Sequence, residues 1–174
     1  MLILFLDMFI VQDRKEIMSY FLNRLDDEQI TFRVIKHKPV WHLDEGLEIQ
    51  KQCMVVKNML LKDHKHAHYY LVLTKGDTRL NFKKLASQFN TSRSQLKFAD
   101  PSELDVTMHV ISGMVSPLIL ETGLPLTIVV ESSLKQAEDL GFHAGTNTET
   151  VVLTYKGLAQ LVTTLGYPII TLED

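Results

Sequence analysis

The sequence predicts a single α/β domain (α+β in the wider sense) that spans residues 1–174. Short runs rich in β-branched and aromatic residues alternate with stretches whose apolar residues recur at helical spacing. The length suits one domain, and no repeat, low-complexity tract or linker divides it. A composition of 45% hydrophobic and 22% charged residues can fill a sizeable core and is not that of a disordered chain.

The first half of the chain predicts three strands and three helices. Alternating or apolar runs place the strands over residues 31–36, 53–61 and 68–74. Capping and breaking residues place the helices after Asp13, within 41–52, and after Asn81. The polar stretch between the second and third strands is short, so we expect these two strands to form a hairpin.

The second half predicts three helices and three further strands. Asp100-Pro101-Ser102-Glu103 opens a helix with proline in its first turn, and a helix capped by Ser132 or Ser133 is expected to end at Gly141. A third helix is expected over 155–165, ended by Gly166. The strands are expected over 126–130, 148–153 and 168–172, with a loop or short strand over 142–147.

The apolar segment Met1–Val11 is too short to span a bilayer. It has no basic residue before it and no small-residue cleavage pattern after it, which argues against a signal peptide. We expect a first strand or an apolar leader packed on the core. The single cysteine, Cys53, excludes an internal disulfide and is consistent with a reducing cytoplasm.

The charge is unevenly distributed along the chain. The segment from Lys57 to Lys97 holds nine basic residues against two acidic ones, although the whole chain has a net charge of −3. A basic segment in an acidic protein would attract a polyanion to one face, and the simpler alternative is a set of solvated surface positions.

Three places in the chain are candidates for chemistry. Lys57 interrupts an otherwise apolar strand, so it must either extend its ammonium outward or face a pocket that takes an anion. Gly113-Met114-Val115-Ser116-Pro117 is an ordinary turn or a loop whose free N–H groups polarise a carbonyl. His143 and Asn147 lie in a loop and are either structural or line a pocket.

Several other constellations are missing or weak. The chain has no GxxxxGK[ST] or GxGxxG loop and no paired-cysteine zinc pattern. His64, His66 and His68 alternate, but they adjoin two lysines at a polar turn, which favours a basic surface loop over a metal site. Cys53 sits among apolar residues and is expected to be a buried structural residue. No cofactor or metal is expected.

Five motifs in fixed order resemble those of the YbaK/ProX family of aminoacyl-tRNA deacylases, which are related to the editing domain of bacterial prolyl-tRNA synthetases. They are Val56-Lys57-Asn58-Met59-Leu60-Leu61-Lys62-Asp63, Tyr70-Leu71-Val72, Asp77-Thr78-Arg79-Leu80, Gly113-x-Val115-Ser116-Pro117 and Phe142-His143-x-x-x-Asn147-Thr148. The similarity covers roughly residues 16–172. It is closest to the ProX branch, which removes alanine from proline tRNA, and it implies a mixed, curved sheet surrounded by helices.

The resemblance also implies roles for individual residues. Lys57 matches the family lysine that holds the phosphate end of the acceptor strand, and Gly113 to Pro117 match a loop that contacts the ester. Asn58, Met114, Val115, Ser116, Pro117, His143 and Asn147 are expected to bind substrate, with Lys57 and Gly113 as the catalytic pair. The chain departs from the family pattern at Ala144-Gly145-Thr146, where a proline and a bulkier residue are expected, so selectivity is the part of the resemblance that this loop puts in question.

The expected function is hydrolysis of mischarged aminoacyl-tRNA in trans, with alanyl-tRNA(Pro) favoured. Water would attack the ester, and the loop N–H groups would each contribute about 3 kcal/mol to oxyanion stabilisation. The expected tRNA contacts are Lys62, Lys65, Arg79, Lys83 and Lys84. We also expect prolyl-tRNA synthetase as a partner, a monomer or weak dimer, and no membrane. Two alternatives stay open: an inactive relative that binds tRNA or a synthetase, and an interaction domain that uses Met1–Val11.

Overall fold

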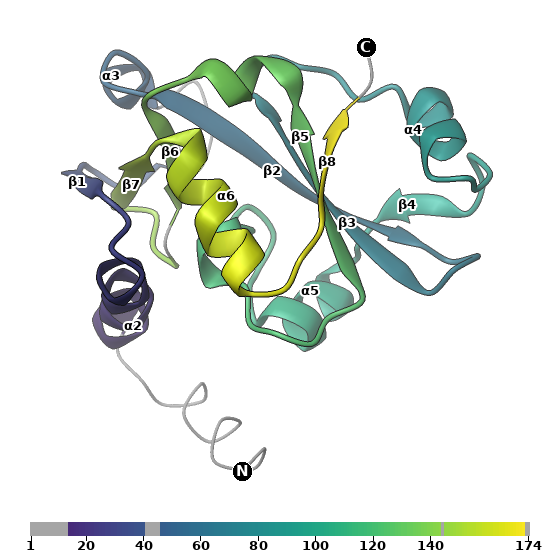
Figure 1. The fold of residues 1–174 in the computed structure, drawn as a ribbon, viewed down its shortest axis with the longest axis horizontal. Coiled ribbons are helices and arrows are strands. Elements are labelled where there is room, and N and C mark those ends of the chain that lie inside the picture. Colours follow the sequence, from purple (N-terminus) through teal and green to yellow (C-terminus); the bar gives the residue numbers. More distant parts are fainter. Residues whose placement is uncertain (1–13, 41–45, 144, 173–174) are drawn as a thin grey trace, which may run out of the picture.

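The longest strand, β2, organises a mixed sheet in the computed structural model, which describes residues 14–40, 46–143 and 145–172 (Figure 1). The eight strands of this described part run in the order β1-β7-β6-β2-β3-β5-β8, with β4 paired to β2 off this path. Their bounds are β1 Phe32–Lys36, β2 Met54–Asp63, β3 His68–Lys75, β4 Leu96–Phe98, β5 Leu126–Glu131, β6 Leu140–His143, β7 Glu149–Leu153 and β8 Ile169–Leu172.

Helices cover both faces of the sheet, and α6 crosses in front of it in Figure 1. The helices are α2 Arg14–Asp27, α3 Leu47–Gln50, α4 Phe82–Gln88, α5 Pro101–Met108 and α6 Tyr155–Thr164, with 3₁₀ turns η2 Pro117–Ile119 and η3 Ser132–Gln136. Side chains of β2 alternate between the two faces, as in any strand. Val56 and Leu60 join the larger core with α2, α5 and α6, while Met59 and Leu61 pack with α4.

Local capping explains where two of the helices begin. The Asn81 side chain accepts hydrogen bonds from the N–H groups of Lys83 and Lys84, which fixes the start of α4. Asp100 and Glu103 form a reciprocal capping box at the start of α5, with Pro101 in its first turn. Both predicted helix starts are therefore confirmed, and so is the mixed α/β fold.

The hairpin between β2 and β3 is confirmed, and each strand is longer than predicted, by two residues and by one. Its tip is held by Asp63, which is fully buried. The Asp63 carboxylate accepts hydrogen bonds from the Lys65 N–H (2.9 Å) and the Thr91 hydroxyl (2.8 Å), and it also contacts the His66 ring. Burial alone would raise the pKa of Asp63, but these contacts hold that pKa below its ordinary value.

The predicted helix from Ser132 to Gly141 is wrong. Only Ser132–Gln136 is helical, as a 3₁₀ turn, and Gly141 lies inside β6 opposite Val152 of β7. A Cβ atom at position 141 would lie 2.6 Å from the Cys53 Sγ. Glycine is therefore required here for the close approach of β6 to the residue preceding β2, not to end a helix.

Other expectations fall partly outside the described residues. The segment Met1–Val11 and the Asp13 cap lie outside them, and of the stretch 41–52 only residues 46–52 are described, with α3 at Leu47–Gln50. No helix within the described ranges is long and apolar enough to cross a membrane.

Candidate active site

A gap along one edge of β2 forms the base of a cavity of about 300 Å³. On this edge β6 pairs with Met54 and Val55, and β4 pairs with Leu61–Asp63. No described strand pairs with the residues in between on that edge. Lys57, Asn58 and Met59 line the cavity from this stretch, and Ser112, Gly113, Met114, Val115 and His143 line it from two other segments.

Lys57 is half-buried and contributes its side chain to the cavity wall. Its neighbour across the hairpin is the buried Thr74. Among the described residues no carboxylate lies within ion-pair distance of the Lys57 ammonium, whereas Lys36, Lys51, Lys62 and Lys75 all have such partners. Of the two alternatives that the sequence left open for Lys57, the structure therefore favours a pocket that takes an anion.

Asn58 presents its main chain to the gap. Main-chain groups of alternate residues point to the same edge of a strand. On this edge the Met54 N–H donates to the Asp139 carbonyl (2.8 Å), and the Leu60 carbonyl accepts from the Ala99 N–H (2.9 Å). Asn58 lies between them in the same alternation, so its N–H and C=O face the cavity. Its side-chain Oδ1 is buried and has no hydrogen-bond partner in the described part of the chain.

The glycine loop closes the cavity from the opposite side with a tight turn. The Met114 N–H donates to the Ile111 carbonyl (3.1 Å), and Gly113 occupies the third position of that turn with a φ of 89°. A type II turn requires a positive φ at this position, which explains the glycine. The Met114 N–H is thus already used. Within the described residues, the N–H groups of Gly113 and Val115 form no main-chain hydrogen bond and are the available donors.

Ser116 and Pro117 do not line the cavity, which corrects their expected role as direct contacts with substrate. The Ser116 Oγ accepts from the Leu118 N–H (3.3 Å) and caps η2, which Pro117 begins. Both residues are buried in the core. They anchor the exit of the loop and thereby hold Gly113 and Val115 in place.

His143 lies at the end of β6 and lines the cavity beside Thr150. Its Nδ1 is buried and has no hydrogen-bond partner among the described residues. Burial lowers the pKa of His143 below its ordinary value, and His37 lowers it further, although a hydrogen bond with the Thr146 backbone opposes this. The ring is therefore neutral at pH 7, and the unpartnered nitrogen is free to bond a ligand.

Asn147 does not line the cavity, which is a second correction. It is buried, and its carbonyl accepts a hydrogen bond from the Val40 N–H (2.9 Å). Asn147 therefore positions the segment that carries Val40, and Val40 itself lines the cavity. The cavity's remaining wall was missed by the sequence reasoning, because its residues are apolar and come from separate elements: Val40, Ile49, Val55 and Val56.

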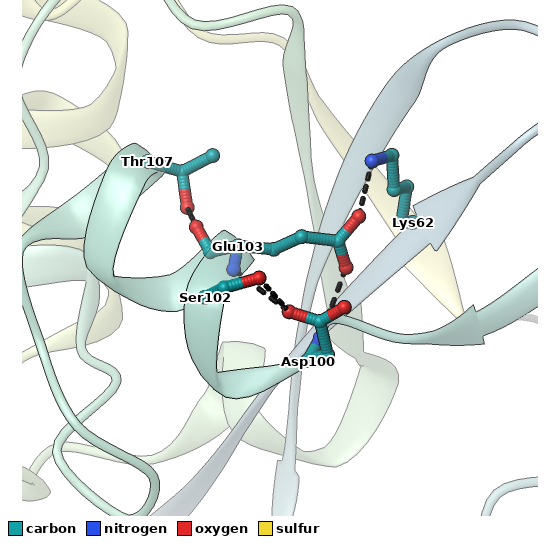
Figure 2. Close-up of polar contacts among 5 residues, drawn as sticks. All are labelled: Lys62, Asp100, Ser102, Glu103 and Thr107. Carbon is teal, nitrogen blue, oxygen red and sulfur yellow. Dashed lines mark hydrogen bonds and ion pairs between the residues drawn. The ribbon is translucent and has the colours of Figure 1, made fainter.

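The expected tRNA-binding residues differ in how free their charges are. Lys62 forms an ion pair with Glu103, as Figure 2 shows, and its ammonium also lies 5.7 Å from the centre of the Tyr69 ring. The hydrogen bond to Glu103 raises the pKa of Lys62 above its ordinary value. The Lys65 ammonium donates to the Asn90 carbonyl (3.0 Å). Arg79, Lys83 and Lys84 are exposed and form no ion pair with a described residue.

Side chains elsewhere account for the other candidates. His66 contacts Asp63, and the His68 ring hydrogen-bonds the Thr127 hydroxyl (2.9 Å). Cys53 is buried, as expected, and burial raises the pKa of its thiol, which makes it a poor nucleophile.

Comparison with known proteins is consistent with this fold and cavity. Residues 46–161 match the model of the aminoacyl-tRNA editing domain family. The "Prolyl-tRNA editing protein ProX" of Acetoanaerobium sticklandii is 28% identical over 147 residues, covering 82% of this chain and 88% of that protein. The "Prolyl-tRNA synthetase associated domain-containing protein 1" of Bos taurus is 29% identical over 154 residues, covering 84% and 90% respectively.

A solved structure agrees with this at the level of the fold. The crystal structure described as "a putative trans-editing enzyme for prolyl tRNA synthetase" superposes with a TM-score of 0.71, at 18% identity, and covers 94% of this chain and 99% of that one. The fold and the cavity are those of an aminoacyl-tRNA deacylase. The chain belongs to the aminoacyl-tRNA editing domain family, which confirms the resemblance seen in its motifs.

Proposed function

We propose that this protein removes alanine from mischarged alanyl-tRNA(Pro), acting in trans in the cytoplasm. The observation that carries the proposal is that Lys57 and the Gly113 loop line one small cavity. The names of two relatives, a prolyl-tRNA editing protein and a prolyl-tRNA synthetase associated protein, support proline tRNA as the substrate and prolyl-tRNA synthetase as a partner. We propose a monomer or weak dimer as the working state.

The reaction needs few groups, because an aminoacyl ester is already activated. A water molecule attacks the ester carbonyl, and the C–O bond to the ribose breaks after the tetrahedral intermediate forms. The N–H groups of Gly113 and Val115 accept the developing oxyanion, and each contributes about 3 kcal/mol by analogy with other acyl transfers. The neighbouring ribose hydroxyl assists the water. Lys57 holds the phosphodiester of the terminal nucleotide and does not act as a base.

Size and charge explain the preference for alanine. A cavity of about 300 Å³ is at the small end for ligand pockets, and it must also hold part of the ribose. Exclusion of a larger proline ring by clash is effective, whereas one methylene of missing contact is worth only about 1–3 kcal/mol. The substrate carries an ammonium group beside its ester, and a neutral His143 does not repel it.

A panel of mischarged tRNAs tests the proposal. Purified protein should release alanine from alanyl-tRNA(Pro) and leave prolyl-tRNA(Pro) intact. Lys57→Ala should abolish the release, while Lys36→Ala, which removes a lysine 83% exposed on β1, should not change it. Intact ester on every mischarged tRNA, or full activity in Lys57→Ala, would contradict the proposed function.

A further inference from the structure

An exposed phenylalanine on β4 stands apart from the core. Phe98 is 56% exposed, although it lies in a strand of the sheet. Its ring meets the Phe82 ring edge to face, with centroids 5.2 Å apart and planes at 73°. The Arg93 guanidinium lies over the Phe82 ring, 4.4 Å from its centre. Phe98, Phe82 and Arg93 thus form a small aromatic and cationic platform that joins β4 to α4.

The platform lies on the same face of the sheet as Lys57. Phe98 pairs directly with Leu61 of β2, and paired residues in antiparallel strands project from the same face. Lys57, Met59 and Leu61 alternate along that face of β2. The distance along the strand from Lys57 to Leu61 is about 13 Å at the usual rise per residue. A chain that leaves the cavity along this face would therefore reach Phe98 within a short span.

The charge around the platform is of one sign. Residues 78–99 contain Arg79, Lys83, Lys84, Arg93 and Lys97 and no aspartate or glutamate. None of these five cations forms an ion pair with a described residue. The contrast is Lys62, whose charge Glu103 neutralises (Figure 2). The surroundings of Phe98 therefore complement a polyanion.

We propose that Phe98, supported by Phe82 and Arg93, stacks on an unpaired nucleobase of the single-stranded acceptor end while the neighbouring cations contact its phosphates. This rests on the proposed function, since it places the platform beside the cavity that takes the aminoacyl end. An exposed aromatic ring in a groove of positive charge is the usual arrangement for binding single-stranded nucleic acid, because every base offers a face for stacking. A protein partner would have to cover the same cations with acidic side chains.

Binding of an uncharged, fluorescently labelled acceptor minihelix with a single-stranded 3′ end tests the platform. Phe98→Ala should weaken binding by about 5- to 100-fold, the range for loss of one stacked base. Phe98→Trp should retain affinity. Phe98→Leu, which keeps apolar bulk without an aromatic face, should bind as weakly as Phe98→Ala. Val106→Ala, at a residue 75% exposed on α5, is the matched control and should bind as wild type.

Three outcomes would overturn the proposal. They are unchanged affinity in Phe98→Ala, wild-type affinity in Phe98→Leu, and an equal loss by Phe98→Ala on a blunt duplex that lacks the single-stranded end. Circular dichroism of each variant establishes that it is folded. Hydrolysis of a minimal alanyl-adenosine ester separates this proposal from the proposed function. Phe98→Ala should leave that hydrolysis unchanged, and a wild-type protein that binds the minihelix through Phe98 but hydrolyses no ester would refute only the deacylase proposal.

Discussion

Gly113→Ala is the substitution whose effect the geometry of the loop defines most closely. Gly113 has a φ of 89°, in the region that favours glycine, and a Cβ atom added there would meet nothing within 4 Å. The substitution therefore creates no clash. Its entire effect must come from the backbone conformation, which an alanine holds only at a cost of about 1–2 kcal/mol.

The protein has two ways to respond, and both are measurable. If the turn keeps its shape, the free energy of unfolding falls by about 1–2 kcal/mol. If the turn relaxes to a negative φ, the N–H groups of Gly113 and Val115 no longer converge on one point in the cavity. Loss of one oxyanion donor lowers kcat by about 10²- to 10³-fold. We expect relaxation to dominate, because the turn is exposed and only one main-chain hydrogen bond, from Met114 to Ile111, closes it.

Gly123→Ala is the matched control for this experiment. Gly123 has a φ of 95°, is likewise exposed, and has nothing within 4 Å of its added Cβ, but it does not line the cavity. Single-turnover deacylation of alanyl-tRNA(Pro) should slow at least 100-fold in Gly113→Ala and stay at the wild-type rate in Gly123→Ala. Equal rates in the two variants would refute an oxyanion role for the loop.

Two further predictions concern His143 and Gly141. Because the pKa of His143 lies below its ordinary value near 6.5, the ring is neutral above that value, and kcat/KM for deacylation should fall only as the pH drops below about 6.5. His143→Gln should remove this acidic limb of the pH profile, and a limb that persists would assign it to another group. The same lowered pKa costs stability as the pH falls below about 6.5, because the unfolded chain then binds the proton more readily. Gly141→Ala should destabilise the protein by about 1–3 kcal/mol, because its Cβ would lie 2.6 Å from the Cys53 Sγ. Adding Cys53→Ala should recover part of that loss in urea unfolding, and strictly additive effects would show that the close approach is not the cause.

The sequence predicts the elements whose signals are local. Asn81 and the Asp100–Glu103 box mark helix starts by residue type and spacing, and both helices begin there. Gly141 shows the limit of such signals, because a glycine after a capped stretch is typical of a helix end. Its real cause is a sulfur atom from a residue far away in the sequence, which no local pattern encodes.

The same division holds for the site. Lys57 could be identified because a charge in an apolar strand requires an explanation, and Gly113 because a loop glycine permits a positive φ. The apolar wall at Val40 and Ile49 gives no such signal, since its residues resemble any other core positions. Whether Ser116 and Asn147 face a ligand or hold the backbone depends on tertiary packing, and here both hold the backbone.

The most direct test of the central claim is a crystal structure with a non-hydrolysable alanyl-adenosine in which an amide replaces the ester. We predict the alanyl group inside the cavity, its carbonyl oxygen within hydrogen-bond distance of the Gly113 or Val115 N–H, and Lys57 beside the ribose and its phosphate position. An analogue bound at any other surface, or one in the cavity with its carbonyl turned away from both N–H groups, would contradict the account.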